Sequence, residues 1–454
     1  MANDLRLEIS DFRAIGHADI ILDGITVIAG ENGSGKSTIS KLLYHTIKVV
    51  NEYDNIVDEQ LKNKLRRISS NFKDVLRDYS YVFDDREARY EELNKQFTYS
   101  IQIISSDFDE SKRLFAELTL NLFDWIIEII DILQSSDWQN KMRTRLRFRN
   151  LDIDKQIEKI NKNLLSNLPS DDRADIADSA LDLTFNRLKE YIETLYTECN
   201  DKKYNRRIDE LFRKLKRQFE TDGGSINYNI YESELAVINR EFDKLSTITD
   251  VRNIIYIDTP MAIGALDNNN KNEHWNDLNK LLMNDSFQND DTFSSQIIHG
   301  SAKLERNDLF RSKFIFKRDD GQEFNLLDVA TGIRSFAILQ MLLNNGTLQE
   351  GTLLILDEPE AHLHPQWIVE YGRFLVYLNQ VIGVKLLVAS HSPDMISALK
   401  YITEKEGNPE NLNFYLAEQR SGEYQYDYKH LGVEIEEIFS SYNKSFDKLN
   451  DYTA

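Results

Sequence analysis

A short segment near the N-terminus, GENGSGKST, has the residue types and spacing of a phosphate-binding loop. Its two inner glycines permit the positive φ angles that aim successive backbone N–H groups at an anion. Lys36 would place its charge on the β- and γ-phosphates of a nucleotide, and Ser37 would ligate Mg²⁺. The predicted nucleotide-binding residues of this segment are Gly30, Asn32, Gly33, Ser34, Gly35, Lys36, Ser37 and Thr38.

The flanking sequence supplies the elements that such a loop needs. GITVIAG, just before it, is a short apolar stretch typical of a buried strand. TISKLLYHTI, just after it, begins an amphipathic helix whose N-terminal dipole favours a bound anion. Strand, loop and helix in this order predict that the segment binds the phosphates of ATP.

Two further motifs in the C-terminal half carry acid–base chemistry. GTLLILDEPEAHLHP is an apolar strand that ends in Asp357 and Glu358, at the sheet edge where doubly wound folds bind ligands. Asp357 would hold Mg²⁺ through water, and Glu358 would polarise the attacking water as a general base. A second apolar strand ends in ASHSP, where His391 would hydrogen-bond the γ-phosphate and the water. His362 and His364 suggest a metal pair, but no third ligand is evident.

Composition limits the classes of protein. The 454 residues allow two or three domains, and the net charge of −21 should repel nucleic acid and anionic membranes, so that any such contact is local. The single cysteine, Cys199, excludes an internal disulfide and suits a reducing cytosol. The charged N-terminus predicts no signal peptide, and the most apolar stretch, from Leu114, contains acids and predicts a buried helix rather than a membrane span. We therefore expect a cytoplasmic protein.

The distribution of glycine divides the chain. None occurs between Gly35 and Gly223, and Pro169 is the only proline there, which indicates long helices. Apolar residues in this interval recur three and four apart without a sustained heptad, as in a compact lobe or short bent arm. The expected domains are an ATPase-head part at 1–43, a helical insertion at 44–250 and a second head part at 251–454.

Outside the insertion the pattern is that of short strands separated by turns. LRLEISDF, HADIILDG and ITVIAG form an N-terminal set, and RNIIYIDTP restarts the sheet after the insertion. SKFIFKRDDGQEFNLL reads as a hairpin that turns at 319–321. TLLILDEP and VKLLVASHSP are continuous apolar runs, as expected of parallel strands buried on both faces. The predicted fold class is α/β.

GENGSGKST, LLILDEPEAHLHP and LLVASHSP together resemble the ABC-type ATPase heads of the SMC, RecF and OLD nuclease superfamily. The chain most closely resembles the bacterial AAA-ATPase-like, OLD-type ATP-binding proteins of antiphage systems such as Septu and PARIS. The resemblance covers both ends of the chain, about half its length, and not the insertion. It implies an ABC-type P-loop head that hydrolyses ATP with Mg²⁺ and works as a homo-oligomer, with ATP held between subunits.

The resemblance assigns four further positions. Such heads are completed by a signature loop that reaches the neighbouring subunit's nucleotide, and here that loop is DVATGIRSFAIL. Ala330 stands where a serine is expected, so Thr331 and Gly332 would meet the γ-phosphate instead. We expect this difference to change the rate of ATP hydrolysis more than the binding of ATP. Arg13 resembles an arginine that contacts phosphate, and Asp258 stands where relatives carry a glutamine sensor.

The remaining sequence limits what the ATPase controls. About sixty residues follow ASHSP, and they lack the clustered carboxylates of a nuclease domain. Basic clusters at 141–149 and 213–217 would be either local contacts to a phosphate backbone or solvated helix faces. Three hypotheses follow: a sensor subunit of an antiphage complex that controls a separate nuclease or toxin, a RecF- or SMC-like ATPase of DNA repair or chromosome maintenance, and a scaffold locked by ATP without turnover.

Overall fold

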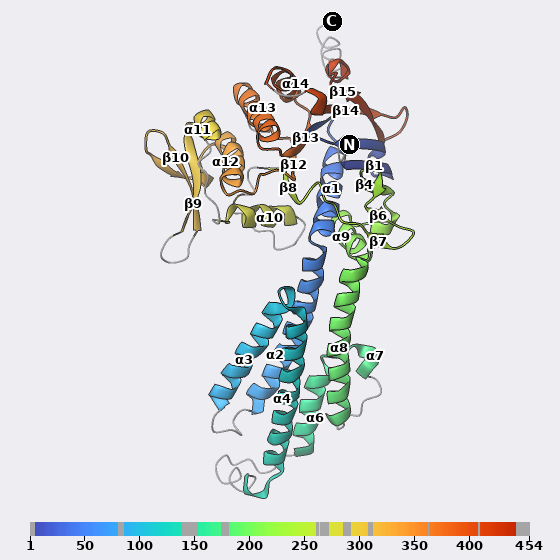
Figure 1. Cartoon of the computed structure of the whole chain (residues 1–454), viewed down its shortest axis with the longest axis vertical. Coiled ribbons are helices and arrows are strands. Elements are labelled where there is room, and N and C mark those ends of the chain that lie inside the picture. Colours follow the sequence, from blue (N-terminus) through green and yellow to red (C-terminus); the bar gives the residue numbers. More distant parts are fainter. Residues whose placement is uncertain are drawn as a thin grey trace. The chain divides into compact units, whose positions relative to one another are not determined.

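The computed structural model forms two compact units, one of residues 1–51 with 207–454 and one of residues 52–206 (Figure 1). The residues that the structure describes are 5–79, 86–138, 153–173, 181–259, 263, 272–284, 292–306, 312–361, 363–406 and 409–441. Both N- and C-terminal sequence segments therefore contribute to the same unit, as expected when an insertion interrupts a domain.

The second unit is helical in its described residues. Its helices are α2 (Tyr53–Tyr79), α3 (Arg86–Gln102), α4 (Phe108–Gln134), α6 (Ile153–Leu165), α7 (Ser170–Arg173) and α8 (Leu181–Asn205). On α4, Leu122 and Ile126 are buried while Asp124 is exposed, so the apolar stretch is an amphipathic helix. Phe123 stacks on Phe185 of α8 and ties these two helices together. No helix in the described residues is long and apolar enough to cross a membrane.

The second unit is shorter than the insertion expected at 44–250. Residues 207–250 belong to the first unit, because α9 (Asp209–Phe219) packs on α1 and β4 (Tyr228–Glu232) pairs antiparallel with β1. The short strands that follow are β5 (Leu235–Ala236), β6 (Ile238–Asn239) and β7 (Lys244–Leu245). The division of roles among the three predicted segments remains a proposal.

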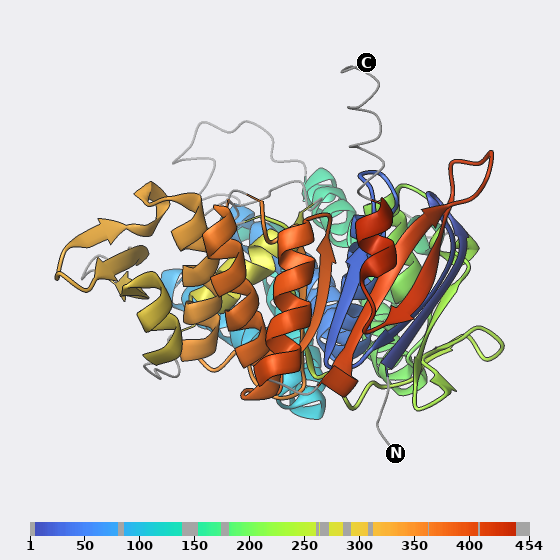
Figure 2. The same ribbon diagram turned by 90° about the horizontal axis from the view of Figure 1, so that it is seen from above.

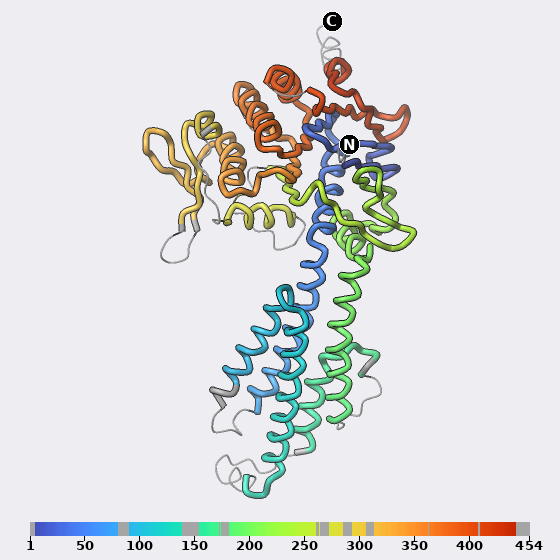
Figure 3. The backbone as a smooth tube through the Cα atoms, viewed as in Figure 1, coloured from blue at the N-terminus to red at the C-terminus, as the bar shows by residue number. Residues whose placement is uncertain are grey.

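A ten-stranded sheet organises the first unit, in the order β5-β4-β1-β2-β15-β14-β3-β13-β12-β8. Besides β4 and β5, the strands are β1 (Leu5–Phe12), β2 (Ile15–Leu22), β3 (Ile25–Ala29), β8 (Asn253–Ile257), β12 (Thr352–Asp357), β13 (Lys385–Ser390), β14 (Leu412–Gln419) and β15 (Tyr426–Gly432). Figure 3 shows the first strands in blue beside the last ones in red. The run from β14 to β8 is parallel throughout, as the apolar strand patterns predict.

Helices cover both faces of these parallel strands. They are α1 (Lys36–Asn51), α10 (Glu273–Leu282), α12 (Thr331–Asn344), α13 (Pro365–Gln380) and α14 (Pro393–Glu406). A further helix, α11 (Thr292–Ile298), packs on α12 and β9. Figure 2 shows α12, α13 and α14 side by side, and alternate strand residues such as Leu354 and Val388 join their apolar core. α1 contacts β8, β12 and β13 through the intervening positions, where Tyr256 meets Tyr44.

A smaller sheet follows α11. Its strands are β9 (Gly300–Arg306), β10 (Ser312–Arg318) and β11 (Glu323–Asn325), in the order β11-β10-β9. β10 and β11 are the predicted hairpin, and Gly321 has a φ of 88° in its turn. The α/β prediction is confirmed for the first unit, and a large helical insertion interrupts that unit.

Candidate nucleotide site

The predicted phosphate loop connects β3 to α1, as its flanking sequence requires. Gly33 and Gly35 have φ angles of 85° and 102°, which residues with a side chain rarely adopt. A Cβ at Gly35 would lie 2.8 Å from Cγ1 of Ile15 on β2, whereas a Cβ at Gly33 would meet nothing within 4 Å. The loop is therefore supported at Gly35 and has open space beside Gly33.

Lys36 extends its ammonium group along this loop. Its Nζ donates to the carbonyl oxygens of Gly30 at 2.8 Å and Glu31 at 3.0 Å. Burial lowers the pKa of Lys36, and the carboxylates of Glu358 and Asp357 favour its charged form. The Lys36 ammonium group is buried, and the two acceptors named here are neutral carbonyls. A triphosphate oxygen would meet this buried cation in the loop.

The buried hydroxyl of Ser34 is suited to bind a phosphate group. Its Oγ is buried and has no hydrogen-bond partner among the described residues, while its carbonyl accepts from the Tyr428 hydroxyl at 3.0 Å. A buried hydroxyl without a partner is costly, and a phosphate oxygen would satisfy it. Asn32 and Ser37 are exposed at the same loop, where a ligand can reach them.

Asp357 lies at the end of β12 against the first turns of α1. Its Oδ1 accepts from the Ser40 hydroxyl at 3.0 Å and its Oδ2 from the Tyr256 hydroxyl at 2.8 Å. Burial raises the pKa of Asp357, and hydrogen bonds from Tyr256, Ser37 and Ser40 act against that rise. The two predicted magnesium ligands, Ser37 and Asp357, thus lie together, and a hydroxyl with a carboxylate is an oxygen donor set that suits Mg²⁺.

Glu358 and His391 meet at the same sheet edge. Asp357 pairs with Ala389 in the parallel ladder, so the residues after these two strands are neighbours. Glu358 has a φ of 48°, and its N–H donates to the Ala389 carbonyl at 2.8 Å. This turn places Oε1 of Glu358 3.3 Å from Nδ1 of His391. The two residues predicted to be catalytic are therefore adjacent.

Glu360 is a site residue that the sequence did not single out. Its side chain is buried, and its Oε1 accepts from the Ser390 hydroxyl at 2.7 Å and from the N–H of His391 at 3.1 Å. Glu360 thereby fixes the end of β13 and the backbone of His391. The third acid of the DEPE segment was the available signal.

Arg13 lies against α9. Its backbone φ is 54°, its Nη2 donates to the Phe219 carbonyl at 2.7 Å, and its guanidinium lies 5.0 Å from the centre of the Phe219 ring. An arginine at the last carbonyls of a helix also interacts favourably with the helix dipole. Contact with a nucleotide would require Arg13 to leave this carbonyl, and stays a prediction.

Thr331 and Gly332 form the first turn of α12. Ala330 is the N-cap and makes no side-chain cap hydrogen bond, because alanine has no acceptor. A Cβ at Gly332 would lie 3.1 Å from Leu363, so the turn packs closely on the segment between β12 and α13. The signature-like turn therefore adjoins the segment that follows Glu358, and its predicted nucleotide contact stays a prediction.

Asp258 and the histidine pair have other partners. Asp258 Oδ2 lies 2.9 Å from Nε2 of His274, and its Oδ1 accepts from Nε1 of Trp275 at 2.8 Å. Burial would raise the pKa of Asp258, but the bonds from α10 outweigh it and lower the pKa. His364 caps α13 by accepting from the N–H of Gln366, and His362 lies outside the described residues. No group of three metal-ligating residues occurs in the part of the chain that the structure describes.

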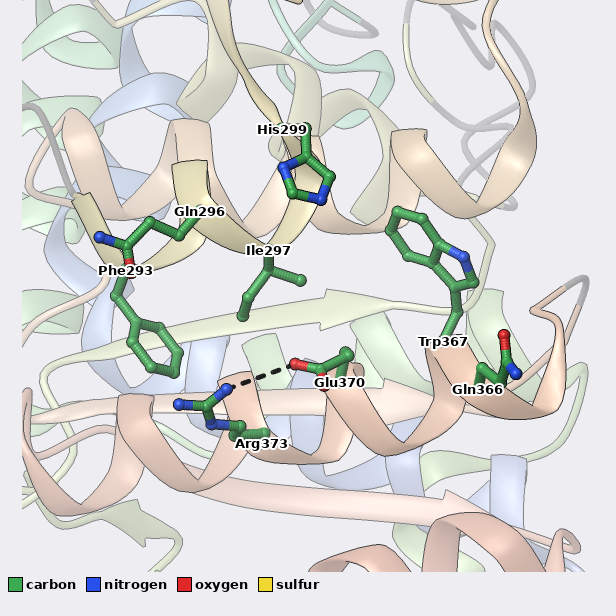
Figure 4. A pocket seen from close by; sticks show the side chains of 8 residues that line it. All are labelled: Phe293, Gln296, Ile297, His299, Gln366, Trp367, Glu370 and Arg373. Carbon is green, nitrogen blue, oxygen red and sulfur yellow. Dashed lines mark ion pairs between the residues drawn. The ribbon is translucent and has the colours of Figure 1, made fainter. Parts of the chain in front are cut away.

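A separate cavity of about 410 Å³ lies between α11 and α13 (Figure 4). Phe293, Ile297 and Trp367 line it together with the Glu370–Arg373 ion pair, whose atoms are 3.6 Å apart. No residue of the phosphate loop and none of the acidic strand end borders this cavity. It is therefore distinct from the candidate nucleotide site.

His45, beside Tyr44 on α1, should make stability pH-dependent. Burial lowers the pKa of His45 well below its ordinary value of 6.5, and the charge of Lys214 adds to the effect. The unfolded chain takes up a proton near that pH whereas the folded chain does not. The free energy of unfolding should therefore fall as the pH drops below 6.5, by at most about 1.4 kcal/mol per pH unit from this group.

Urea unfolding between about pH 5 and about pH 7 measures this slope. His45→Phe should flatten it, and His17→Phe, at an exposed position on β2, should not. Identical slopes for the wild type and His45→Phe would contradict the assignment.

A parallel sheet with a glycine-rich loop after β3 and acids after β12 defines a P-loop nucleotide-binding ATPase domain. The chain belongs to the AAA ATPase domain family, which matches residues 5–396. No curated protein matches this sequence.

Solved structures of SMC head domains are similar to the chain at low identity. One SMC head bound to the C-terminal winged-helix domain of ScpA is 9% identical, with 95% of this chain and 98% of that chain covered and a TM-score of 0.38. The SMC head of Pyrococcus furiosus with an extended coiled coil is 10% identical over 100% of both chains, with a TM-score of 0.32. That of Pyrococcus yayanosii is 12% identical over 98% and 100%, with a TM-score of 0.35.

Proposed function

We propose that this chain binds and hydrolyses ATP with Mg²⁺. The observation that supports this most is the convergence of Lys36, Asp357, Glu358 and His391, which come from three separate strand ends, at one edge of the sheet. Lys36 would bind the β- and γ-phosphates, and the orphan Ser34 hydroxyl would join it. Glu358 would take the proton of the attacking water while His391 orients that water and the γ-phosphate.

The carboxylates around the loop favour a bound cation. The carboxylates of Glu358, Asp357, Glu360 and Glu31 all act on the single ammonium group of Lys36. A triphosphate alone would be repelled by these groups. Mg²⁺ would neutralise charge on the β- and γ-phosphates when bound. Ser37 and Asp357 would hold it, and nucleotide binding should therefore depend strongly on Mg²⁺.

We further infer a homo-oligomer with ATP held between heads, as in the SMC- and RecF-type ATPases that the motifs resemble. The first turn of α12 supports this, because a helix N-terminus without a side-chain cap offers backbone N–H groups to an anion. Thr331 and Gly332 would meet the γ-phosphate bound by a second copy. Arg13 would add a phosphate contact after release from α9.

The output would be control of another protein, as the sensor or regulator subunit of an antiphage defence complex with a separate nuclease or toxin. The motif resemblance to OLD-type antiphage proteins supports this role. The alternative is a RecF- or SMC-like ATPase of DNA repair, which the net charge of −21 disfavours. The basic cluster at 213–217 contains Arg213, which pairs with Glu210 at 2.7 Å. The other basic cluster, at 141–149, lies outside the described residues.

Solution mass and nuclease assays test this function. The mass of the purified chain, measured by sedimentation with and without Mg·ATP, should rise to that of a dimer or larger assembly when Mg·ATP is added. DNA incubated with the chain alone should remain intact. A monomer under both conditions, or robust DNA cleavage, would contradict the proposal. Single-turnover ATP hydrolysis separates an ATPase from a scaffold that only binds ATP.

A further inference from the structure

Tyr256 is a buried polar side chain on β8, whose other two buried residues are apolar. It lies on β8, where its neighbours Ile255 and Ile257 face the apolar core under α12 to α14. The parallel register pairs Tyr256 with Ile355, two residues before Asp357. Because side chains alternate along a strand, Tyr256 and Asp357 lie on the same face of the sheet, toward α1. Tyr256 is only 1% exposed.

Within the part of the chain that the structure describes, the Tyr256 hydroxyl bonds to Asp357, a predicted magnesium ligand. It donates to Oδ2 of Asp357 at 2.8 Å, while Ser40 of α1 donates to Oδ1 at 3.0 Å. Two donors on different oxygens, one from the sheet and one from the helix, fix the plane of the carboxylate. A phenylalanine would fill the same space, so packing alone does not account for the hydroxyl.

Helix α10 in turn holds the ring of Tyr256. The His274 ring lies 4.5 Å from the Tyr256 ring, centre to centre, at an interplanar angle of 35°. Nε1 of Trp275 donates to Asp258, the residue that follows β8, at 2.8 Å, and Nε2 of His274 lies 2.9 Å from Oδ2 of Asp258. α10 therefore contacts the end of β8 at Asp258 and packs on the ring of Tyr256. A shift of α10 would move the Tyr256 hydroxyl relative to Asp357.

We propose that Tyr256 is a positioning residue for Asp357 and that α10, through His274, sets the position of Tyr256. The Tyr256 hydroxyl orients the Asp357 carboxylate that would hold Mg²⁺. Because α10 packs on Tyr256, the position of α10 would affect the orientation of this carboxylate. The inference rests on the proposed function, because it assigns Asp357 to the magnesium site. Groups that orient metal ligands commonly change metal affinity by about 10- to 100-fold when they are removed.

The first test separates magnesium binding from nucleotide binding. Binding of an ATP analogue with an imido group between its β- and γ-phosphates is measured by calorimetry in EDTA and at increasing MgCl₂. Tyr256→Phe should raise the MgCl₂ concentration for half-maximal enhancement by about tenfold. Affinity in EDTA should stay within about twofold of wild type, because the ring and its packing remain.

Tyr415→Phe is the matched control. Tyr415 is also a buried tyrosine of the same sheet, on β14, and its hydroxyl accepts from the Ile21 N–H at 2.9 Å. Tyr415→Phe should leave the magnesium dependence of analogue binding unchanged. Circular dichroism of both variants checks that each folds as the wild type does. An equal loss of affinity for Tyr256→Phe in EDTA and in MgCl₂ would mean a purely structural role and overturn the proposal.

A double-mutant cycle tests the link to α10. His274→Phe keeps an aromatic ring beside Tyr256 but removes the nitrogen that lies 2.9 Å from Asp258. It should shift the magnesium dependence in the same direction by about threefold. Tyr256→Phe combined with His274→Phe should shift it no further than Tyr256→Phe alone, because both act through one hydroxyl. Additive shifts would overturn the role of α10. If the wild-type chain does not bind the analogue in MgCl₂, the proposed function is wrong. If Tyr256→Phe binds the analogue with the magnesium dependence of the wild type, only the inference about Tyr256 is wrong.

Discussion

Lys36→Ala is expected to abolish ATP binding. The ammonium group lies inside the phosphate loop, among backbone carbonyls and the carboxylates of Glu358 and Asp357. Without it, the triphosphate would face those carboxylates with no positive side chain from the loop. We expect a loss of at least about 100-fold in affinity for Mg·ATP, equivalent to about 2.7 kcal/mol, measured by calorimetry.

Two further variants decide whether charge is the cause. Lys36 also bridges Gly30 and Glu31, so its removal could loosen the loop. Lys36→Met retains most of the side-chain volume without the charge and should lose affinity to the same degree. Lys317→Ala removes an exposed charge of β10 and should bind as wild type does. Equal affinity of Lys36→Ala and the wild type would count decisively against the site.

The sequence predicted the parallel strands and the loop between them because these are local signals. An apolar run such as that of β12 is buried on both faces by its neighbours, and a glycine such as Gly35 is required where φ is positive. The order of the motifs then placed Asp357 and His391 at one sheet edge, since parallel strands end at the same edge. The ladder between β12 and β13 confirms that neighbourhood.

Contacts between residues distant in sequence were not predictable in this way. Tyr256 and Ser40 bind Asp357 from another strand and from α1, and no spacing in the sequence links them. Glu360 reaches Ser390 because two neighbouring strand ends bring them together. Hydrogen-bond partners of this kind depend on register and helix packing, which a single sequence leaves open.

The absence of glycine indicated helices but did not indicate which unit they join. α9 is a helix within the predicted insertion, yet it belongs to the first unit. Tyr228 begins β4, whose pairing with β1 returns the chain to the sheet well before residue 250. Helix propensity reports local conformation, and the boundary of a unit is set by packing that a composition shift does not measure.

Glu358→Gln is expected to keep ATP bound and to slow its hydrolysis. Glu358 is 41% exposed, so its carboxylate is accessible to water, and its Oε1 lies 3.3 Å from Nδ1 of His391. Glu360 is 6% exposed, and its Oε1 is already occupied by the donors of Ser390 and His391. The accessible carboxylate is therefore the better general base. An amide of the same shape cannot accept the proton, which should slow single-turnover hydrolysis by about 100-fold or more.

Quench-flow measurement of ATP hydrolysis, with Mg·ATP affinity measured in parallel, checks this assignment. Glu370→Gln, on α13 and away from the phosphate loop, should hydrolyse ATP as the wild type does. Glu360→Gln should disturb the placement of His391 and the stability of the β13 end, because a Gln side chain must replace a buried acceptor of two bonds. If Glu360→Gln stopped hydrolysis with ATP still bound while Glu358→Gln turned over normally, the general base would be Glu360, and the accessibility argument that selects Glu358 would be wrong.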